Sequence, residues 1–314
     1  MQITKHIPVM LEQSINGMNI QKKGIYIDAT YGFGGHSNKI LSLLDDEGRL
    51  FAVDKDINSI KVAEKALLDD KRFSLKHGCF SSLGDYSKEW GIYGAVNGIL
   101  FDLGVSSEHL DNPERGFSFR QNGPIDMRFD QSCGLSACEW IDSVDEQTLY
   151  KVIKRYGEER YSKRIAREII YHREKDKINN THDLVKVIDR ATPKNEKNKH
   201  NATRTFQAIR IFINNELELL KEALHNSYNI LAPKGRLVLI TYHSLEDRVI
   251  KDFLTHTDKS LSAPRDLPLK NEFLTKMYNL VVKSMKPLDT EISSNPRSRS
   301  AKLNILEKVN ENYV

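Results

Sequence analysis

The sequence predicts an α/β protein with a mostly parallel, doubly wound β-sheet that is interrupted by a long, mostly helical insertion. Short apolar segments alternate with helical segments over roughly the first hundred residues, as they do when crossover helices join parallel strands. The alternation stops near residue 107 and resumes at residue 203. A glycine-rich loop follows the first apolar segment, where folds of this kind commonly bind a ligand.

Four strands are expected before the insertion. The first covers 25–27, the glycine-rich loop follows it, and a helix begins near His36. The second strand ends at Asp54. The elements that follow are a helix at 57–68, a strand at 73–76, a helix at 83–90 and a strand at 96–101. Right-handed crossovers between such strands place a ligand at their carboxyl ends.

Three further strands are expected after the insertion. The apolar residues of 203–231 repeat with the helical period and predict one long amphipathic helix. A turn formed by Pro233, Lys234 and Gly235 is expected to end it. The remaining elements are a strand at 236–242, a helix at 245–254, a loose segment at 264–269, and strands at 280–283 and 302–306 that are expected to pair as a hairpin. We therefore expect a sheet domain of residues 1–106 and 203–314, with residues 107–202 inserted.

The insertion is polar, strongly charged and mostly helical in pattern. Helices are expected at 144–156, 161–171 and 181–190, with a basic loop at 193–200. Residues 151–175 contain nine Lys or Arg against four Glu. A basic face of this density suits phosphate binding, and a solvated surface helix is the alternative. Its place between two strands suits a domain that holds a large substrate over a ligand site.

The composition is ordinary for a soluble globular protein, with 39% hydrophobic and 29% charged residues. No apolar run approaches the roughly 20 residues that span a membrane, and the N-terminus lacks the apolar core of a signal peptide. We therefore expect a cytoplasmic protein. The three cysteines are odd in number and lack metal-type spacing, so they predict neither a disulfide framework nor a metal site.

The glycine-rich loop indicates a ligand that contains a ribose. Gly32, Gly34 and Gly35 have no Cβ atom, so the backbone there can turn sharply and approach a ligand closely. The helix that follows would direct free N–H groups at an anionic part of that ligand. Asp54 ends the next strand, where its carboxylate can accept hydrogen bonds from both ribose hydroxyls. A glycine turn without a ligand is the alternative.

The spacing of the glycines favours S-adenosylmethionine over a dinucleotide. Dinucleotide sites have a third glycine three residues after the second, and this chain has Ser37 at that position. S-adenosylmethionine offers the loop only a carboxylate and an ammonium group, and offers its adenosine to the second strand. The sequence therefore predicts the methyl donor as the ligand.

Polar residues also end two later strands. Asp102 follows the fourth strand and can face the sulfonium or the methyl acceptor, and capping of the next turn is its alternative role. His243 follows the fifth strand, where it can assist proton loss or serve as a structural histidine. Ser244 and Asp247 are expected to form a capping box at the start of the next helix.

Arginine and phenylalanine alternate in the segment after Asp102. The residues concerned are Arg115, Phe117, Phe119, Arg120, Arg128 and Phe129. This mixture suits phosphate contacts combined with base stacking, and a self-packed loop with solvated arginines is the alternative.

Short sequence blocks spread over nearly the whole chain form a further pattern. In chain order they are His6-x-Pro8-Val9, Asp28-x-Thr30-x-Gly32-x-Gly34-Gly35-His36-Ser37, Asp102-Leu103-Gly104-Val105-Ser106-Ser107, Arg115-Gly116-Phe117-Ser118-Phe119, Pro124-x-Asp126-Met127-Arg128, Tyr156-Gly157-Glu158-Glu159-Arg160, Thr203-Arg204-Thr205-Phe206-Gln207-Ala208, His243-Ser244-Leu245-Glu246-Asp247-Arg248 and Pro296-Arg297-x-Arg299-Ser300. Together they resemble the bacterial ribosomal RNA small-subunit methyltransferase H family. So many ordered blocks are far more specific than the glycine loop alone.

The resemblance implies the class I S-adenosylmethionine-dependent methyltransferase fold, a Rossmann-like, doubly wound sheet of seven strands with an inserted helical substrate-binding domain. It implies an enzyme that uses S-adenosyl-L-methionine to methylate the exocyclic N4 amine of a decoding-centre cytidine in 16S rRNA of the small ribosomal subunit. Asp102 and His243 are the catalytic candidates. The cofactor-binding positions that the resemblance transfers to this chain are Gly34, Gly35, His36, Asp54, Phe80, Asp102 and His109.

Two positions depart from the family pattern. His109 stands where the family usually has Gln, and an imidazole cannot copy both faces of an amide. Tyr242 replaces the usual Phe and keeps an aromatic ring. Methylation of cytosine at a ring carbon needs a cysteine nucleophile, which that class of enzymes carries in a Pro-Cys sequence. Transfer to an amine needs no such nucleophile, which agrees with the absence of a Pro-Cys sequence from this chain.

Two other functions are kept as alternatives. A DNA amino-methyltransferase would use the same cofactor and chemistry, but this chain lacks the Pro-Pro-aromatic motif after Asp102. A ribosome-assembly factor without enzymatic activity is the second alternative. A homodimer is left open, and no metal is expected.

Overall fold

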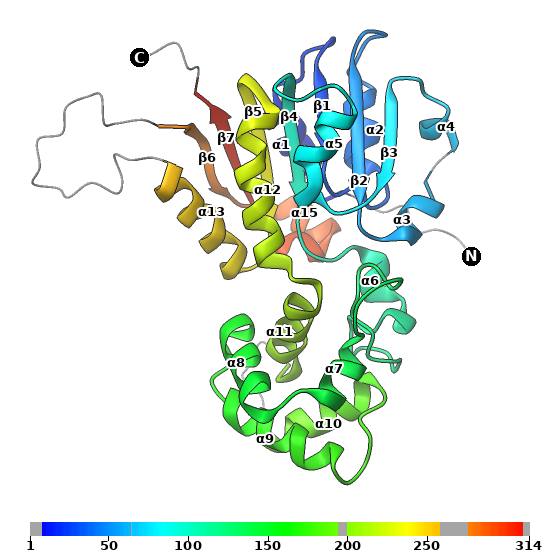
Figure 1. The fold of residues 1–314 in the computed structure, drawn as a ribbon, viewed down its shortest axis with the longest axis vertical. Coiled ribbons are helices and arrows are strands. Elements are labelled where there is room, and N and C mark those ends of the chain that lie inside the picture. The colour runs from blue at the N-terminus through cyan, green and yellow to red at the C-terminus, as the bar shows by residue number, and fades with distance from the viewer. Residues whose placement is uncertain (1–7, 64, 194–199, 258–275, 310–314) are drawn as a thin grey trace, which may run out of the picture. The chain divides into compact units, whose positions relative to one another are not determined.

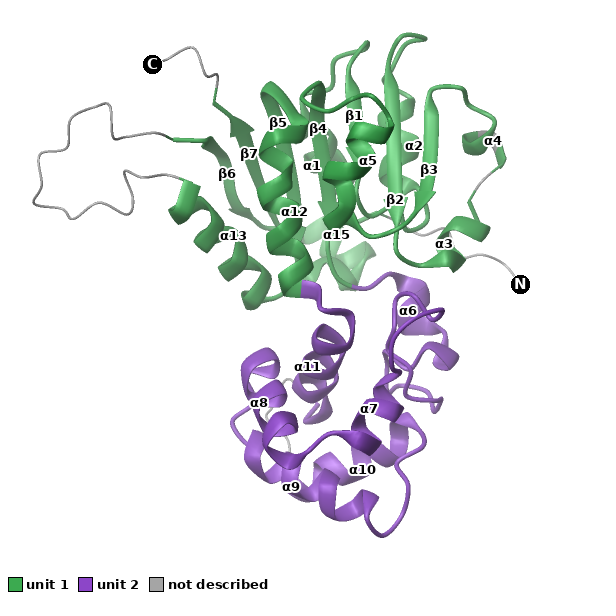
Figure 2. Cartoon of the chain, viewed as in Figure 1, with its two compact units in different colours: residues 1–104, 217–314 green, residues 105–216 purple. Residues whose placement is uncertain are grey.

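A computed structural model describes residues 8–63, 65–193, 200–257 and 276–309 (Figure 1). The chain forms two compact units, each with its own hydrophobic core (Figure 2). Unit 1 contains residues 1–104 and 217–314, and unit 2 contains residues 105–216. The expected basic loop at 193–200 lies mostly outside the described residues, and the loose segment at 264–269 lies wholly outside them.

Unit 1 is built on a seven-stranded sheet with the strand order β3-β2-β1-β4-β5-β7-β6. The strands are β1 (Ile25–Asp28), β2 (Arg49–Asp54), β3 (Phe73–His77), β4 (Val96–Asp102), β5 (Leu231–Thr241), β6 (Tyr278–Met285) and β7 (Lys302–Lys308). The first five run parallel, and β7 pairs antiparallel with β5 and β6. The predicted doubly wound, seven-stranded class I methyltransferase fold is therefore confirmed, together with the terminal hairpin.

Helices cover both faces of this sheet (Figure 1). One face carries α1 (Leu11–Met18) and α2 (Gly35–Leu41), and the other carries α5 (Leu83–Glu89), α12 (Glu216–Ile230) and α13 (Ser244–Thr257). Because the central strands are covered twice, they are apolar on both faces, and Tyr26, Ile27, Ile99 and Leu100 are all fully buried. The shorter elements of unit 1 are α3 (Ile57–Lys61), α4 (Lys65–Leu68), η1 (Phe80–Ser82), α15 (Asp289–Ser294) and η4 (Pro296–Ser300).

The register of the central strands brings three aspartates to one edge of the sheet. Asp28, the last residue of β1, is level with Ala52 of β2 and Leu100 of β4. Each of those two strands continues for two more residues and ends at Asp54 or Asp102. The order of the strands reverses between β1 and β4, and ligands bind at the carboxyl ends of strands at such a point.

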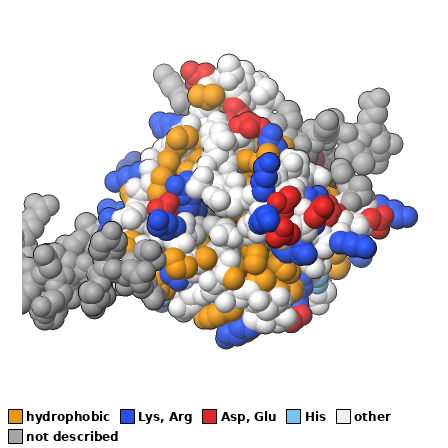
Figure 3. All heavy atoms as spheres, turned by 90° about the horizontal axis from the view of Figure 1, so that it is seen from above, with side chains coloured by type: hydrophobic (Ala, Val, Ile, Leu, Met, Phe, Trp, Pro, Cys, Tyr) orange, Lys and Arg blue, Asp and Glu red, His pale blue; other side chains and the backbone are white. Residues whose placement is uncertain are grey.

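The opposite, amino-terminal edge of the sheet carries balanced charge. Its loops contain ion pairs between Lys23 and Glu47 (2.5 Å) and between Arg72 and Asp70 (2.6 Å). The view from above shows Lys and Arg side chains beside Asp and Glu side chains (Figure 3). The Lys23–Glu47 pair is exposed, and an exposed ion pair contributes little to stability.

Unit 2 is helical and packs around its own core. It contains α6 (Ser107–Asp111), η2 (Pro113–Arg115), α7 (Ala137–Ser143), α8 (Glu146–Gly157), α9 (Ser162–Arg173), α10 (Thr181–Ala191) and α11 (Ala202–Asn214). The three helices predicted from the sequence of the insertion correspond to α8, α9 and α10. Helices α8 and α11 approach closely, because a Cβ atom on Gly157 would lie 2.6 Å from the carbonyl oxygen of Arg204.

The prediction of one long helix over 203–231 was wrong, because the structure has two helices there. Helix α11 ends at Asn214, Asn215 has a φ of 52°, and α12 begins at Glu216. Asparagine adopts this left-handed conformation more readily than most residues, which lets the chain change direction. Helix α11 then packs on α8, so unit 2 extends to Glu216, whereas the expected insertion ended at residue 202.

Two shorter predictions also differ from the structure. The expected helix at 57–68 is divided into α3 and α4. The expected turn at 233–235 lies within β5, where Lys234 has a φ of 61° and the pairing with β4 changes register. A local irregularity in one strand therefore accommodates the Pro-Lys-Gly sequence without ending the strand.

Candidate functional site

Three carboxylates with raised pKa values lie at the carboxyl edge of the sheet in unit 1. Burial is the largest cause of each shift, and it raises the pKa to about 6 for Asp28 and Asp54 and to about 7 for Asp102. The negative charge of Asp28 raises the pKa of the other two further. Buried carboxylates that repel one another are stabilised by a ligand that carries positive charge.

Asp54 is held at the end of β2 by two backbone groups. Its Oδ2 accepts a hydrogen bond from the Gly32 N–H at 2.6 Å, and its Oδ1 accepts one from the Asp56 N–H at 2.7 Å. The Gly32 backbone has a φ of 54°, which suits a residue without a Cβ atom. Each carboxylate oxygen keeps a second lone pair, so Asp54 can still accept the two hydroxyl hydrogen bonds expected from a ribose.

Asp28 is a further residue of this site that was not predicted from the sequence, where it appeared only as the first residue of the family block containing the glycine loop. It is 1% exposed, and it accepts hydrogen bonds from the Ser37 hydroxyl (2.6 Å) and the Thr30 N–H (3.2 Å). These bonds tie β1 to the glycine loop and to α2. The available signal was a carboxylate that ends an apolar strand directly before a glycine loop.

The glycines of the loop allow close packing around it. Gly34 has a φ of 74°, and a Cβ atom there would lie 2.6 Å from the Tyr31 hydroxyl oxygen. A Cβ atom on Gly35 would lie 2.2 Å from Cγ of Pro8. His36, on the first turn of α2, is 6% exposed and has Nε2 3.2 Å from the Val9 carbonyl oxygen. Contact of these three predicted cofactor residues with the methyl donor stays a prediction.

The backbone N–H and both carboxylate oxygens of Asp102 have neighbours that hold them in place. Its N–H donates to the Thr30 hydroxyl oxygen (2.7 Å), and its Oδ1 accepts from the Tyr242 hydroxyl (2.8 Å). Its Oδ2 lies 4.0 Å from Nδ1 of His36. With a pKa of about 7, this carboxyl exchanges its proton near neutral pH, which suits a general acid or base.

Phe80 begins η1, directly after the strand β3 and the turn that follows it. Its ring packs edge-on against Phe101 of β4, with 5.8 Å between the ring centroids. The ring is partly exposed beside the end of the strand that carries Asp102. Its predicted contact with the cofactor stays a prediction.

His243 forms a reciprocal cap at the start of α13. Its Nδ1 accepts from the Glu246 N–H (3.3 Å), and the Glu246 carboxylate accepts from the N–H groups of His243 (3.1 Å) and Tyr242 (2.7 Å). A reciprocal cap is therefore formed by His243 and Glu246, one position before the predicted capping box of Ser244 and Asp247. Asp247 instead accepts from the Thr241 hydroxyl at 2.7 Å. The structural role predicted as an alternative for His243 is present, and its catalytic role stays a prediction.

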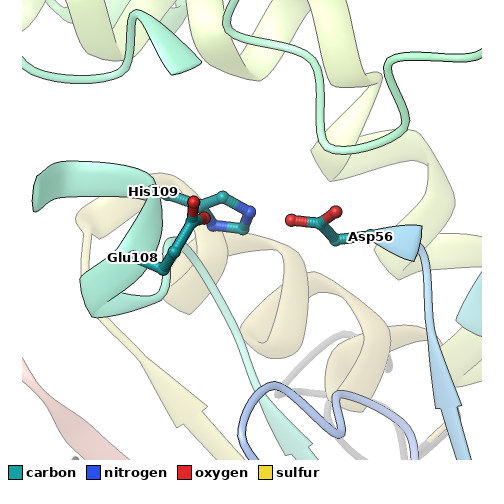
Figure 4. A group of neighbouring side chains, drawn as sticks. All are labelled: Asp56, Glu108 and His109. Atoms are coloured by element: carbon teal, nitrogen blue, oxygen red, sulfur yellow. The ribbon is translucent and has the colours of Figure 1, made fainter. Parts of the chain in front are cut away.

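His109 lies on α6 of unit 2 (Figure 4) and has a similar capping role there. The Ser106 N–H donates to its Nδ1 (3.1 Å), and its own N–H donates to the Ser106 hydroxyl oxygen (3.3 Å). The ring packs against Phe117 and Phe129, with centroid distances of 4.8 and 5.1 Å. Because Nδ1 accepts a hydrogen bond, the neutral ring carries its proton on Nε2. Contact between His109 and the cofactor stays a prediction.

The alternating Arg and Phe residues of unit 2 divide between structural and exposed positions. Arg115 is 2% exposed, pairs with Glu108 at 3.2 Å and donates to two backbone carbonyl groups. Arg128 pairs with Asp126 at 2.7 Å. The loop therefore packs on itself, but Arg115 and Arg128 are held inside it rather than solvated, and Arg120 is exposed.

Helices α8 and α9 and the turn between them carry a strongly basic surface, which we call the basic face. Its members are exposed Lys and Arg side chains: Lys151, Lys154, Arg155, Arg160, Lys163, Arg164 and Arg167. The guanidinium groups of Arg160 and Arg164 each lie 5.8 Å from the ring centroid of Tyr161. Arg173 is different, because it donates to the carbonyl groups of Ile141 and Val144 and so stabilises α7. Cationic groups beside an aromatic ring suit contact with a nucleic acid.

Among the described residues, no helix has the length and apolar character needed to cross a membrane. The solved structures that match this chain include an rRNA methylase from Streptococcus thermophilus (12% identity, 97% of this chain and 98% of that chain, TM-score 0.41). A SAM-dependent O-methyltransferase from Thermotoga maritima (10%, 100% and 70%, 0.43) and NSun6 from Pyrococcus horikoshii with SFG (14%, 98% and 53%, 0.44) are also similar. Similarity at this level carries no conclusion about activity.

The family comparison is more informative, because the model of the MraW methylase family matches residues 3–309. That range includes both strand-end carboxylates predicted from the sequence, the glycine loop and the whole of unit 2. The suspected family is therefore confirmed, and with it the cofactor S-adenosyl-L-methionine. This chain therefore belongs to the MraW methylase family.

Proposed function

We propose that the protein transfers a methyl group to the exocyclic N4 amine of a decoding-centre cytidine in 16S rRNA of the small ribosomal subunit. The observation that carries this proposal is Asp102, a hydrogen-bonded carboxyl group with a pKa of about 7 at the ligand-binding edge of the sheet. An exocyclic amine must lose one proton when it gains a methyl group, and a carboxylate of this pKa accepts that proton near neutral pH.

The residues at the sheet edge fit S-adenosyl-L-methionine. Asp54 has lone pairs available for the ribose hydroxyls, and the backbone is open to close approach at Gly32, where a Cβ atom would have its nearest neighbour, the Thr30 carbonyl oxygen, at 3.9 Å. Burial raises the pKa values of Asp28 and Asp102 at this edge, and a ligand with ammonium and sulfonium groups would favour the ionised form of both carboxyl groups. When bound, the cofactor supplies an electrophilic methyl group.

The chain's own residues then have to orient the amine and remove its proton. Asp102 is fixed by Thr30 and Tyr242, so its carboxylate is already oriented before substrate binds. The N4 nitrogen would form a bond to the methyl carbon as the carbon–sulfur bond of the donor breaks, the electron pair of that bond would stay on sulfur, and one amine proton would pass to the Asp102 carboxylate. This route needs no covalent bond between the protein and the cytosine ring, in agreement with a chain that has no Pro-Cys block.

The basic face of unit 2 supports an RNA substrate. Its seven exposed Lys and Arg residues can neutralise backbone phosphates, and Tyr161 between Arg160 and Arg164 can stack on an unpaired base. We propose that unit 2 holds the RNA while unit 1 holds the cofactor. Unpaired cytidines suit this arrangement, because their N4 amines are accessible without opening a duplex.

The experiment uses small ribosomal subunits that lack methylation at the target, incubated with labelled S-adenosyl-L-methionine. Purified wild-type protein, Asp102→Asn and Asp85→Asn are compared, and labelled nucleotides are mapped by digestion and mass spectrometry. Asp85 is a suitable control because its side chain is 85% exposed on α5. We expect label on cytidine N4 with wild type and Asp85→Asn, and at least about a hundredfold slower transfer with Asp102→Asn.

Two results would redirect the proposal to the alternatives. Label on the amine of a DNA base and none on RNA would favour a DNA amino-methyltransferase. Tight binding to the small subunit, with cofactor bound but no methyl transfer to any RNA, would favour a ribosome-assembly factor.

A further inference from the structure

The hydroxyl group of Tyr242 contacts the proposed proton acceptor directly. Tyr242 follows β5, and its hydroxyl donates to Oδ1 of Asp102 at 2.8 Å. Strands β4 and β5 are paired here, with Asp102 level with Ile240, so the two side chains project from adjacent strand ends. A phenylalanine at this position could fill the same space but could not donate a hydrogen bond.

The position of the Tyr242 ring is fixed from several directions. Its N–H donates to the Glu246 carboxylate at 2.7 Å. The ring packs over Gly104, where the φ of 92° favours glycine and a Cβ atom would lie 3.3 Å from Cδ2 of Tyr242. Its other apolar contacts are with the core of unit 1. The hydroxyl therefore reaches Asp102 without a loss of rotamer freedom at the time of reaction.

The direction of the hydrogen bond follows from the surrounding charges. Burial, together with the carboxylates of Asp102, Glu246 and Glu291, raises the pKa of Tyr242 well above its usual value. The hydroxyl therefore keeps its proton and acts as the donor. The other oxygen of Asp102 faces His36, at 4.0 Å, and Asp28 of β1 contributes negative charge. The groups that face Asp102 are thus Tyr242, His36, Asp28 and the hydroxyl of Thr30.

We propose that Tyr242 is a positioning residue for the methyl-transfer reaction. Its hydroxyl holds the Asp102 carboxylate in one orientation and keeps it ionised at a lower pH than a phenylalanine here would allow. The inference rests on the proposed function, because it assumes that Asp102 accepts the proton from the amine. Tyr242 keeps its own proton throughout, and one proton moves from the amine nitrogen to Asp102.

The physical basis is a competition among three effects at Asp102. Burial raises its pKa, Asp28 raises it further, and the hydrogen bond from Tyr242 lowers it. Removal of the hydroxyl leaves the first two effects unopposed. A hydrogen bond to a charged group is strong enough to move the titration of that group by about one to two pH units.

The test compares wild type with Tyr242→Phe, which keeps the ring and its packing on Gly104. Carbon-13 NMR of the labelled Asp102 carboxyl group measures its titration in the full-length protein without cofactor. The pH dependence of kcat/KM for methyl transfer is measured on the same two proteins. Tyr26→Phe is the matched control, because it removes a buried hydroxyl that accepts from the Gln21 N–H, away from the carboxyl edge of the sheet.

Tyr242→Phe is expected to move the Asp102 titration and the acidic limb of kcat/KM upward by about one pH unit, with activity largely retained at high pH. Tyr26→Phe is expected to leave both midpoints unchanged. An Asp102 titration that is the same in wild type and Tyr242→Phe overturns the inference. Failure of the wild-type protein to methylate ribosomal RNA overturns the proposed function instead, and the NMR titration still decides whether Tyr242 controls the ionisation of Asp102.

Discussion

Replacement of Asp28 by asparagine is expected to stabilise the cofactor-free protein at neutral pH. Asp28 is fully enclosed, and burial raises its pKa from 3.8 to about 6. Between pH 3.8 and about 6, Asp28 therefore keeps its proton in the folded state, whereas in the unfolded state it has released that proton. The stability that this proton contributes is fully present below pH 3.8 and is lost as the pH rises through about 6.

The magnitude follows from the shift of about two pH units. The total linked free energy is about 3 kcal/mol, of which about 1.4 kcal/mol is lost between pH 5 and pH 7.5. Asparagine has a similar shape, and its carbonyl oxygen can still accept from the Thr30 N–H, but it carries no charge at any pH. It also removes a negative charge that raises the pKa values of Asp54 and Asp102.

The assay is urea unfolding of wild type and Asp28→Asn at pH 5 and pH 7.5, without cofactor. At each pH, the unfolding free energy of wild type is subtracted from that of the variant. We expect this difference to be larger at pH 7.5 than at pH 5 by about 1.4 kcal/mol or more. Asp85→Asn serves as the exposed control and should follow wild type at both pH values. An identical change with pH in wild type and Asp28→Asn would refute the reasoning.

Three further predictions test other parts of the site. Asp54→Asn should weaken S-adenosyl-L-methionine binding about tenfold or more. The affinity of wild type should rise as the pH increases through about 6, because a cationic ligand favours the ionised carboxylate, and calorimetry across this pH range measures both effects. The double variant Arg160→Gln with Arg164→Gln should weaken RNA binding and leave cofactor affinity unchanged. The slope of log binding constant against log salt concentration should become shallower by about two units, and titrations at several salt concentrations that gave the wild-type slope would contradict this prediction. Arg115→Gln should lower the unfolding free energy by about 3 kcal/mol, because it leaves Glu108 and two backbone carbonyl groups without their partner; an unchanged urea midpoint would rule out this structural role.

The features that sequence alone predicted depend on short-range patterns. Apolar runs with regular alternation predicted the strands that the structure contains, and the glycine loop followed by Asp54 predicted a cofactor site at the edge where the structure brings these residues together. These signals are local, because the central strands are mostly apolar and each turn needs particular residues. The family then followed from ordered blocks along the whole chain.

The features that were missed depend on contacts between distant parts of the chain. The hydrogen bond between Tyr242 and Asp102 joins residues that are 140 positions apart, so no sequence spacing indicates it. The burial of Arg115 depends on the carbonyl groups of residues 128 and 129, which turn toward it only in the folded loop. The break at Asn215 is a single left-handed residue in an otherwise helical pattern, and its apolar period continues on both sides.

The most direct test of the proposed function is the identity of the methylated atom. Small ribosomal subunits that lack the modification would be incubated with the purified protein and labelled S-adenosyl-L-methionine, and the labelled nucleoside identified by mass spectrometry. The account predicts one methyl group on the N4 nitrogen of a single decoding-centre cytidine, dependent on Asp102. Label on a ring carbon or a ribose oxygen, or label that persists unchanged in Asp102→Asn, would contradict it.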